Sequence, residues 1–174
     1  MSNNVVPEKL INFRAYNDGN DLLGVTDVQL PSLDAMTETV KGAGIAGEVD
    51  SPVLGHFGSM ETVLNWRTIS KPGMNLASQK GVSLDLRGAQ QFYDPEKSEC
   101  VVKAVKCVIR GVPKKTELGK LDVGTTTGSS NTLETNYIKV IIGETVMEVD
   151  KYNYISNIGG TDYLADVREA LGLN

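Results

Sequence analysis

The chain has 174 residues, with 17 Lys or Arg against 22 Asp or Glu, so its formal net charge is −5. This length suits one domain with its own core, and the acidic balance argues against a general nucleic-acid binder. One His and two Cys argue against a His-rich metal site and a disulfide scaffold, and we expect no metal and no cofactor. No apolar run approaches the ~18 residues of a membrane-spanning helix, and the first residues do not resemble a secretory signal.

Short apolar runs separated by Gly, Asn and Asp predict a mainly β fold. A first hairpin is expected to join residues 9–16 and 21–30 through the turn at 17–20, where Asn, Asp and Gly tolerate positive φ. The expected buried face of its first strand carries Ile11, Phe13 and Ala15.

The glycine-rich segment 42–58 breaks this regularity. It begins with Gly42-Ala43-Gly44-Ile45-Ala46-Gly47, which matches the dinucleotide-binding pattern G-x-G-x-x-G by letter. The residues that follow, Val49-Asp50-Ser51-Pro52, do not open the helix that such a site needs. Residues 42–58 are therefore expected to form a long loop or an extended, mobile arm.

Regular patterns return after residue 59. The expected elements begin with a strand over 59–69 that has Trp66 on its buried face and a short helix over 74–80. A strand is expected over 82–93, where Val82, Leu84 and Leu86 alternate with polar residues and form the buried face, and another over 100–111. A polar surface loop over 112–131 and a hairpin of 132–142 with 145–150 follow. A terminal helix is predicted over 162–173, with Thr161 as its N-cap and Gly172 at its end. Leu164, Val167 and Leu171 share one face of this helix, which is expected to be buried. The sequence thus predicts one domain, residues 1–174, built as a β-barrel or sandwich with one flanking C-terminal helix.

No catalytic motif is complete. His56 is the only histidine, and no nucleophile elbow accompanies it. Glu148 and Asp150 share a strand face, as two glycosidase carboxylates could, but with 22 acids such pairs arise by chance, and a solvated surface is the expected explanation. Cys100 and Cys107 are expected on opposite faces of one strand as free thiols. An enzyme built on His56 or on the acidic pair is the weakest hypothesis, and we expect none.

Charge is unevenly spread along the chain. Residues 95–120 hold more bases than acids, whereas residues 32–61 and 132–174 hold more acids than bases. Solvated faces explain this pattern. A sharper interpretation is that acidic and basic faces meet on neighbouring copies, where they would set orientation more than affinity.

Three groups of segments occur in a familiar order: Lys9–Tyr16 with Leu23–Pro31; Val40–Gly47 with Ser59-Met60-Glu61 and Trp66; and Ile158–Leu164 running through Arg168 to Leu173. Together they resemble the major tail tube protein of contractile-tailed (P2-like) phages and related contractile bacteriocins. The resemblance implies a tail-tube type β domain without catalysis. It also implies hexameric rings that stack into a hollow tube inside a contractile sheath.

The resemblance further implies partners and a location. The partners would be other copies of the chain, the tail sheath, the baseplate and the tail terminator, with no membrane. A tape measure or DNA would occupy the lumen without specific binding, which a net acidic subunit favours because like charges repel. The location would be a virion tail or phage-tail-like particle, and the bacterial host cytoplasm during assembly.

On this interpretation, residues 42–58 are the arm that reaches neighbouring subunits. The expected contact residues are Lys41, Gly42, Gly44, Ile45, Gly47, Glu48, Val49, Asp50, Val53 and Leu54. The N-terminal segment and the 112–131 loop are further contact regions. The alternative is a hexameric secreted or carrier ring of the type VI secretion type, which forms single rings and no tubes.

Overall fold

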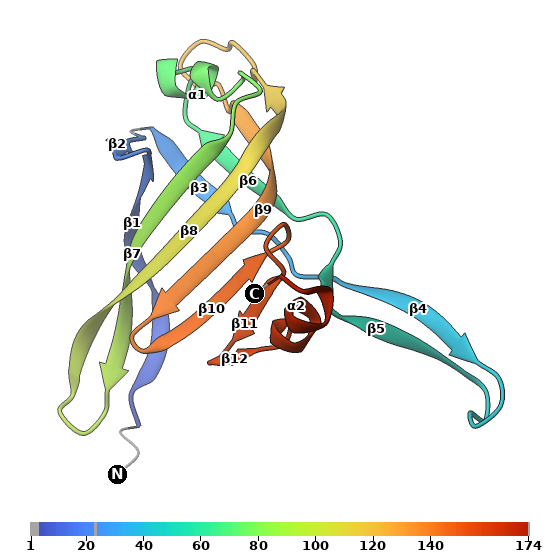
Figure 1. Cartoon of the computed structure of the whole chain (residues 1–174). Coiled ribbons are helices and arrows are strands. Elements are labelled where there is room, and N and C mark those ends of the chain that lie inside the picture. Colours follow the sequence, from blue (N-terminus) through green and yellow to red (C-terminus); the bar gives the residue numbers. More distant parts are fainter. Residues whose placement is uncertain (1–3, 23, 174) are drawn as a thin grey trace.

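The computed structural model describes residues 4–22 and 24–173. Its strands and helices are, in order, β1 (Val6–Asn17), β2 (Asn20–Asp21), β3 (Val25–Gln29), β4 (Ala35–Lys41), β5 (Glu48–Phe57), β6 (Glu61–Trp66), α1 (Lys71–Asn75), β7 (Val82–Asp94), β8 (Glu99–Glu117), β9 (Ser130–Ile142), β10 (Thr145–Asp150), β11 (Ile155–Ile158), β12 (Thr161–Asp162) and α2 (Ala165–Leu171). Figure 1 shows a twisted sheet body from which the β4–β5 hairpin projects to one side.

The main sheet runs in the order β12-β11-β10-β9-β8-β7-β1-β2, and neighbouring strands are antiparallel. Strand β9 branches the sheet, because its first part pairs with β6 and its later part pairs with β10. Strand β3 extends this branch by pairing with β6. The branch carries β3 and β6 behind β7 and β8 (Figure 1), so the body is a sandwich whose two layers share β9.

The core lies between these two layers. Leu64 of β6, Leu84 of β7, Ile109 of β8 and Leu133 of β9 have no exposed surface. Alternating side chains of each strand reach this core, as the period of two in a pleated strand requires. Trp66 is also buried, and its indole N–H donates to Asn131 Oδ1 at 2.8 Å.

The tight turns follow from local sequence. Asp18 and Gly19 have φ of +48° and +82°, which produces the turn between β1 and β2 that residues 17–20 predict. Gly143, with φ of +59°, closes the predicted β9–β10 hairpin. These elements, the β6 strand and the alternating Val82, Leu84 and Leu86 are confirmed.

Tertiary pairing overturns part of the first hairpin. Strand β3 pairs with β6 and not with β1, so β1 keeps only a two-residue partner, β2, on that side. The described strands therefore form an open sandwich and no closed barrel, while the mainly β class with a flanking C-terminal helix is confirmed. A register shift between Leu10 and Asn12 leaves Ile11 52% exposed, so its expected burial is wrong. Leu23, predicted to lie in the second strand, falls outside the described residues, as do Met1, Ser2, Asn3 and Asn174.

Three further boundaries differ from the prediction. Helix α1 starts at Lys71 because the Ser70 hydroxyl caps it by accepting the Gly73 N–H at 3.2 Å. Strand β8 continues through Pro113 to Glu117, which shortens the polar loop to residues 118–129. Helix α2 begins only at Ala165, because Thr161 pairs with Ile158 in a short strand instead of capping the helix. Neither helix of the described chain has the length and apolar character needed to cross a bilayer.

Candidate functional site

The most distinctive surface is the β4–β5 hairpin. Its pairs run from Ala35↔Phe57 to Lys41↔Glu48, with a register shift between Ala35 and Thr37, so residues 48–57 form a strand. Of the two alternatives for 42–58, the long loop is therefore wrong, because β4 supplies the hydrogen-bonding partner that this segment lacks by itself. The extended arm stays a prediction. Only residues 42–47 form the turn, where Gly42, Gly44 and Gly47 all have positive φ.

The two faces of the hairpin differ in chemistry. On one face, Thr39 donates to Asp50 at 2.8 Å, and Lys41 lies 3.6 Å from Glu48. The opposite face carries a stripe of apolar side chains, each between 41% and 53% exposed. This stripe, called the arm stripe below, consists of Met36, Val40, Val49 and Val53. One polar pair, Glu38 opposite Ser51, lies within it.

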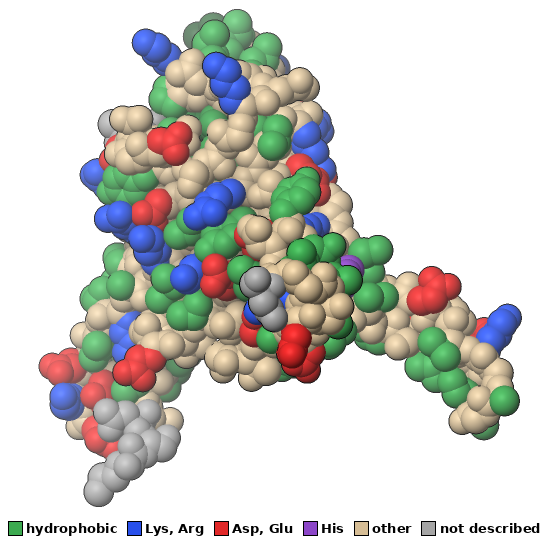
Figure 2. Space-filling view, in the orientation of Figure 1, with side chains coloured by type: hydrophobic (Ala, Val, Ile, Leu, Met, Phe, Trp, Pro, Cys, Tyr) green, Lys and Arg blue, Asp and Glu red, His purple; other side chains and the backbone are tan. Residues whose placement is uncertain are grey.

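Nothing in the described chain covers the arm stripe, because both strands of the hairpin are almost entirely exposed. Figure 2 shows hydrophobic side chains along the hairpin with charged groups beside them and at its tip. An isolated two-stranded hairpin is only marginally stable in water. An uncovered apolar stripe on such a hairpin marks a surface that another molecule covers.

The base of the hairpin is held firmly against the body. Gly55 has a φ of +64°, and a Cβ there would lie 2.5 Å from Leu164 Cγ. Leu164, just before α2, is only 3% exposed. Lys151 Nζ donates to the Gly58 carbonyl at 2.5 Å, and the Gly58 N–H donates to Asp34 O at 2.9 Å. The hairpin therefore leaves the body in a defined direction.

These anchoring residues were not identified from the sequence. Gly55 offered one signal, because an isolated glycine inside a strand marks a close approach of another group. The predicted buried face of the terminal helix includes Leu164 and Leu171; Leu164 is buried, whereas Leu171 is 54% exposed. No local pattern indicates that Lys151 reaches the hairpin.

A second unpartnered feature is the outer edge of β1. One edge of β1 pairs with β7 from Val6 to Asn17, whereas the other edge meets β2 only at Tyr16 and Asn17. Over residues 6–14 the described chain supplies no strand on that side. Such an open edge presents backbone N–H and C=O groups that another strand can pair with.

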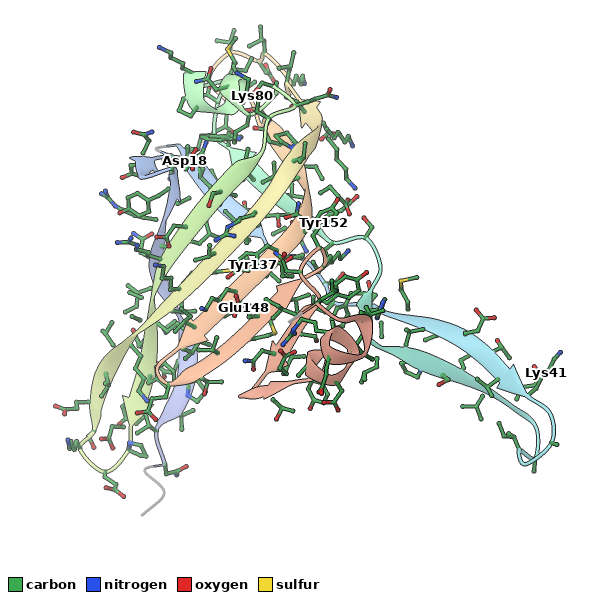
Figure 3. The ribbon with its side chains drawn as sticks, viewed as in Figure 1. Asp18, Lys41, Lys80, Tyr137, Glu148 and Tyr152 are labelled. Atoms are coloured by element: carbon green, nitrogen blue, oxygen red, sulfur yellow. The ribbon has the colours of Figure 1, made fainter. Side chains whose placement is uncertain are left out.

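The residues considered for catalysis have structural surroundings. The exposed His56 Nδ1 lies 2.7 Å from the Leu54 carbonyl. Glu148, which Figure 3 labels together with Tyr137, accepts from the Tyr137 hydroxyl at 2.8 Å. Burial together with this carboxylate raises the pKa of Tyr137 to about 12. Asp150 accepts the backbone N–H of Tyr152 at 3.1 Å. Among the described residues, no group of three or more His, Cys, Asp and Glu is arranged to hold a metal.

The two cysteines behave as their spacing predicts. Cys100 is exposed and Cys107 is buried, so they lie on opposite faces of β8 and form no disulfide. Burial raises the pKa of the Cys107 thiol to about 11, and Asp85 adds to this effect. Cys107 is therefore an unreactive core thiol at neutral pH.

A β sandwich with an anchored, apolar-striped hairpin and an open strand edge defines a class: structural subunits that are completed by other molecules. Comparison with known proteins identifies the family. The family model described as phage tail tube protein FII matches residues 7–172, and the chain belongs to this family. It is also 27% identical over 179 residues to the tail tube protein of Escherichia phage P2, covering 97% of this chain and 99% of that protein.

A solved structure shares the fold. The sheath-tube complex of the extracellular contractile injection system PVC contains a chain with a TM-score of 0.53 and 11% identity, over 78% of this chain and 92% of that one. The PVC sheath/tube terminator has a TM-score of 0.49 and 12% identity, over 78% and 96%. The chain is thus a structural subunit of a tail tube, in a virion tail or tail-like particle, and it is not an enzyme.

Proposed function

We propose that copies of this chain form hexameric rings that stack into a hollow conduit inside a contractile sheath, with the β4–β5 hairpin as the arm between subunits. The observation that carries the arm assignment is the uncovered arm stripe on a hairpin whose base is fixed to the body. Head-to-tail contacts that close produce rings, and contacts that do not close produce filaments. The open edge of β1 supplies a second contact for assembly.

The proposed contact residues have distinct tasks on the hairpin. Val49 and Val53 belong to the arm stripe, and Ile45 in the turn and Leu54 in β5 are further exposed apolar side chains of the hairpin. The Lys41–Glu48 pair and Asp50 stiffen the polar face. Gly42, Gly44 and Gly47 allow the turn its positive φ values.

The remaining partners follow from what the similar proteins assemble with. The PVC structures are a sheath-tube complex and a sheath/tube terminator. We extend this to a tail sheath, a tail terminator and a baseplate for the present chain. The tube would assemble in the bacterial host cytoplasm, and a tape measure or DNA would occupy its lumen without specific binding.

Electron microscopy of the purified chain tests the proposal. Tubes are expected from the wild type. The test variant joins Glu38 to Ser51 through an Asn-Gly turn and removes Thr39–Asp50, so that Ser51 supplies the N–H that closes the turn, which Pro52 lacks. This is better than deleting residues 42–58, because Phe57 packs against the core. This variant should fold and stay soluble, but should form no tubes.

A second pair of variants keeps the hairpin intact. Val40→Ser with Val49→Ser removes the centre of the arm stripe and should prevent tubes, whereas Val40→Ile with Val49→Ile keeps it apolar and should preserve them. Long tubes from the shortened hairpin would overturn the arm assignment. Wild-type protein that forms only single rings would favour the carrier-ring alternative.

A further inference from the structure

A second apolar surface lies at the end of the body that carries α1. Residues 67–80, which include α1, meet the 118–127 loop there, and together they are called the crest below. The crest exposes Val123 completely and Leu121 to 86%. Its other exposed apolar side chains are Ile69, Met74 and Leu118.

Hydrogen bonds and packing hold the crest in one conformation. The Lys120 N–H donates to Thr127 O at 2.9 Å, and the Thr127 N–H donates to Arg67 O at 2.8 Å. Gly119, with φ of +83°, brings its backbone so close to the Thr127 carbonyl that a Cβ would collide with it. Leu76, 2% exposed, fastens the α1 side to the core. These contacts fix the loop, so Leu121 and Val123 stay exposed although the burial of apolar side chains is favourable.

The crest is also basic. Residues 67–80 contain Arg67, Lys71 and Lys80 and no acid. Asp122 lies 3.5 Å from Lys120, so the loop neutralises its own charge. Within the part of the chain that the structure describes, Arg67, Lys71 and Lys80 take part in no ion pair. Figure 2 shows Lys and Arg side chains next to hydrophobic ones at this end, and Figure 3 marks Lys80 there.

The hairpin has the complementary character. Residues 35–57 contain three acidic residues, Glu38, Glu48 and Asp50, and one Lys, Lys41. Lys41 forms an ion pair with Glu48. Glu38 lies within the arm stripe. An apolar stripe with an embedded carboxylate matches an apolar surface with basic groups, since the contact buries both apolar areas and pairs the charges.

We infer that the crest is the acceptor for the hairpin of a second copy of this chain. The inference deepens the proposed function and rests on it. The hairpin and the crest lie at separate places on one subunit (Figure 1), so a subunit cannot join them within itself. Repeated from copy to copy, this contact is heterologous: each subunit donates a hairpin and accepts one, which permits indefinite growth.

The test uses two variants that each lack one side of the contact. The arm variant is Val40→Ser with Val49→Ser, and the crest variant is Leu121→Ser with Val123→Ser. Neither should form tubes alone. When the two are mixed, the intact crest of the arm variant should accept the intact hairpin of the crest variant. Growth should stop at this complex, because it has no other intact crest or hairpin left. Analytical ultracentrifugation should show a complex of about twice the mass of either variant alone.

Controls separate the possible outcomes. Leu121→Met with Val123→Ile keeps the crest apolar and should form tubes. Circular dichroism should show every variant folded, since the replaced side chains are exposed. A crest variant that still forms tubes, or a mixture that gains no mass, would overturn the inference while leaving the proposed function standing. Wild-type protein that forms no tubes would instead contradict the proposed function.

Discussion

Gly55 is the point where the hairpin meets the body, and replacing it with alanine should be costly. A Cβ at Gly55 would meet three Leu164 side-chain carbons at 2.5, 2.6 and 2.9 Å. An L-residue with the left-handed backbone of Gly55, φ +64°, costs about 1–2 kcal/mol. Overpacking against a buried side chain adds about 1–3 kcal/mol. Gly55→Ala should therefore lower the free energy of unfolding by about 2–5 kcal/mol.

Gly159→Ala isolates the backbone part of this cost. Gly159 has a φ of +63°, and nothing lies within 4 Å of the position that its Cβ would take. Its replacement should cost only about 1–2 kcal/mol. The difference between the two variants measures the collision with Leu164. In a Leu164→Ala background this difference should vanish, because the side chain that collides has been removed.

Urea unfolding of the monomer, below the concentration at which it assembles, measures these values. Fluorescence of Trp66, which is 2% exposed, reports on the core. Gly55→Ala should also weaken tube formation, because a displaced Leu164 no longer fixes the direction of the hairpin. Equal losses for Gly55→Ala and Gly159→Ala would refute the packing argument, as would a difference that persists when Leu164 is alanine.

Three other predictions concern the cysteines, the behaviour at high pH and the lumen. A thiol reagent at neutral pH should modify Cys100 in the folded protein and both cysteines after unfolding; rapid native labelling of Cys107 would contradict its burial. The pKa of Tyr137 is raised to about 12 in the fold, above the ordinary ~10, so its contribution to stability is complete below pH ~10 and is lost as pH rises toward 12. Tyr137→Phe should lack this alkaline loss, which unfolding curves across that range would check. Assembled tubes should retain no DNA in a filter assay at low salt, whereas retention would show an attractive inner wall.

Local patterns predicted much of the sheet. Alternation located Val82, Leu84 and Leu86 on the buried face of β7, and turn residues located the Asp18-Gly19 and Gly143 turns. These features depend only on neighbours along the chain, because the pleat repeats every two residues and positive φ favours Gly, Asn and Asp.

Features that depend on distant segments were missed. Residues 48–57 have no apolar period, and they form β5 only because β4 lies opposite. Likewise β3 carries the pattern of a hairpin partner for β1, but packing into the core places it beside β6. The start of α2 moved for a local reason instead, since Thr161 pairs with Ile158 across the Gly159-Gly160 turn and does not cap the helix.

The sequence alone was enough for the mainly β class, the tail tube resemblance, the free thiols and the position of the glycine-rich segment. Each of these is a property of composition, local period or the order of short segments. The tertiary structure decided that the segment is a hairpin with one apolar face, fixed at Gly55 by Leu164 and at Gly58 by Lys151. It also brought α1 and the 118–127 loop together into one surface. These arrangements join residues far apart in the chain, so only the folded chain could reveal them.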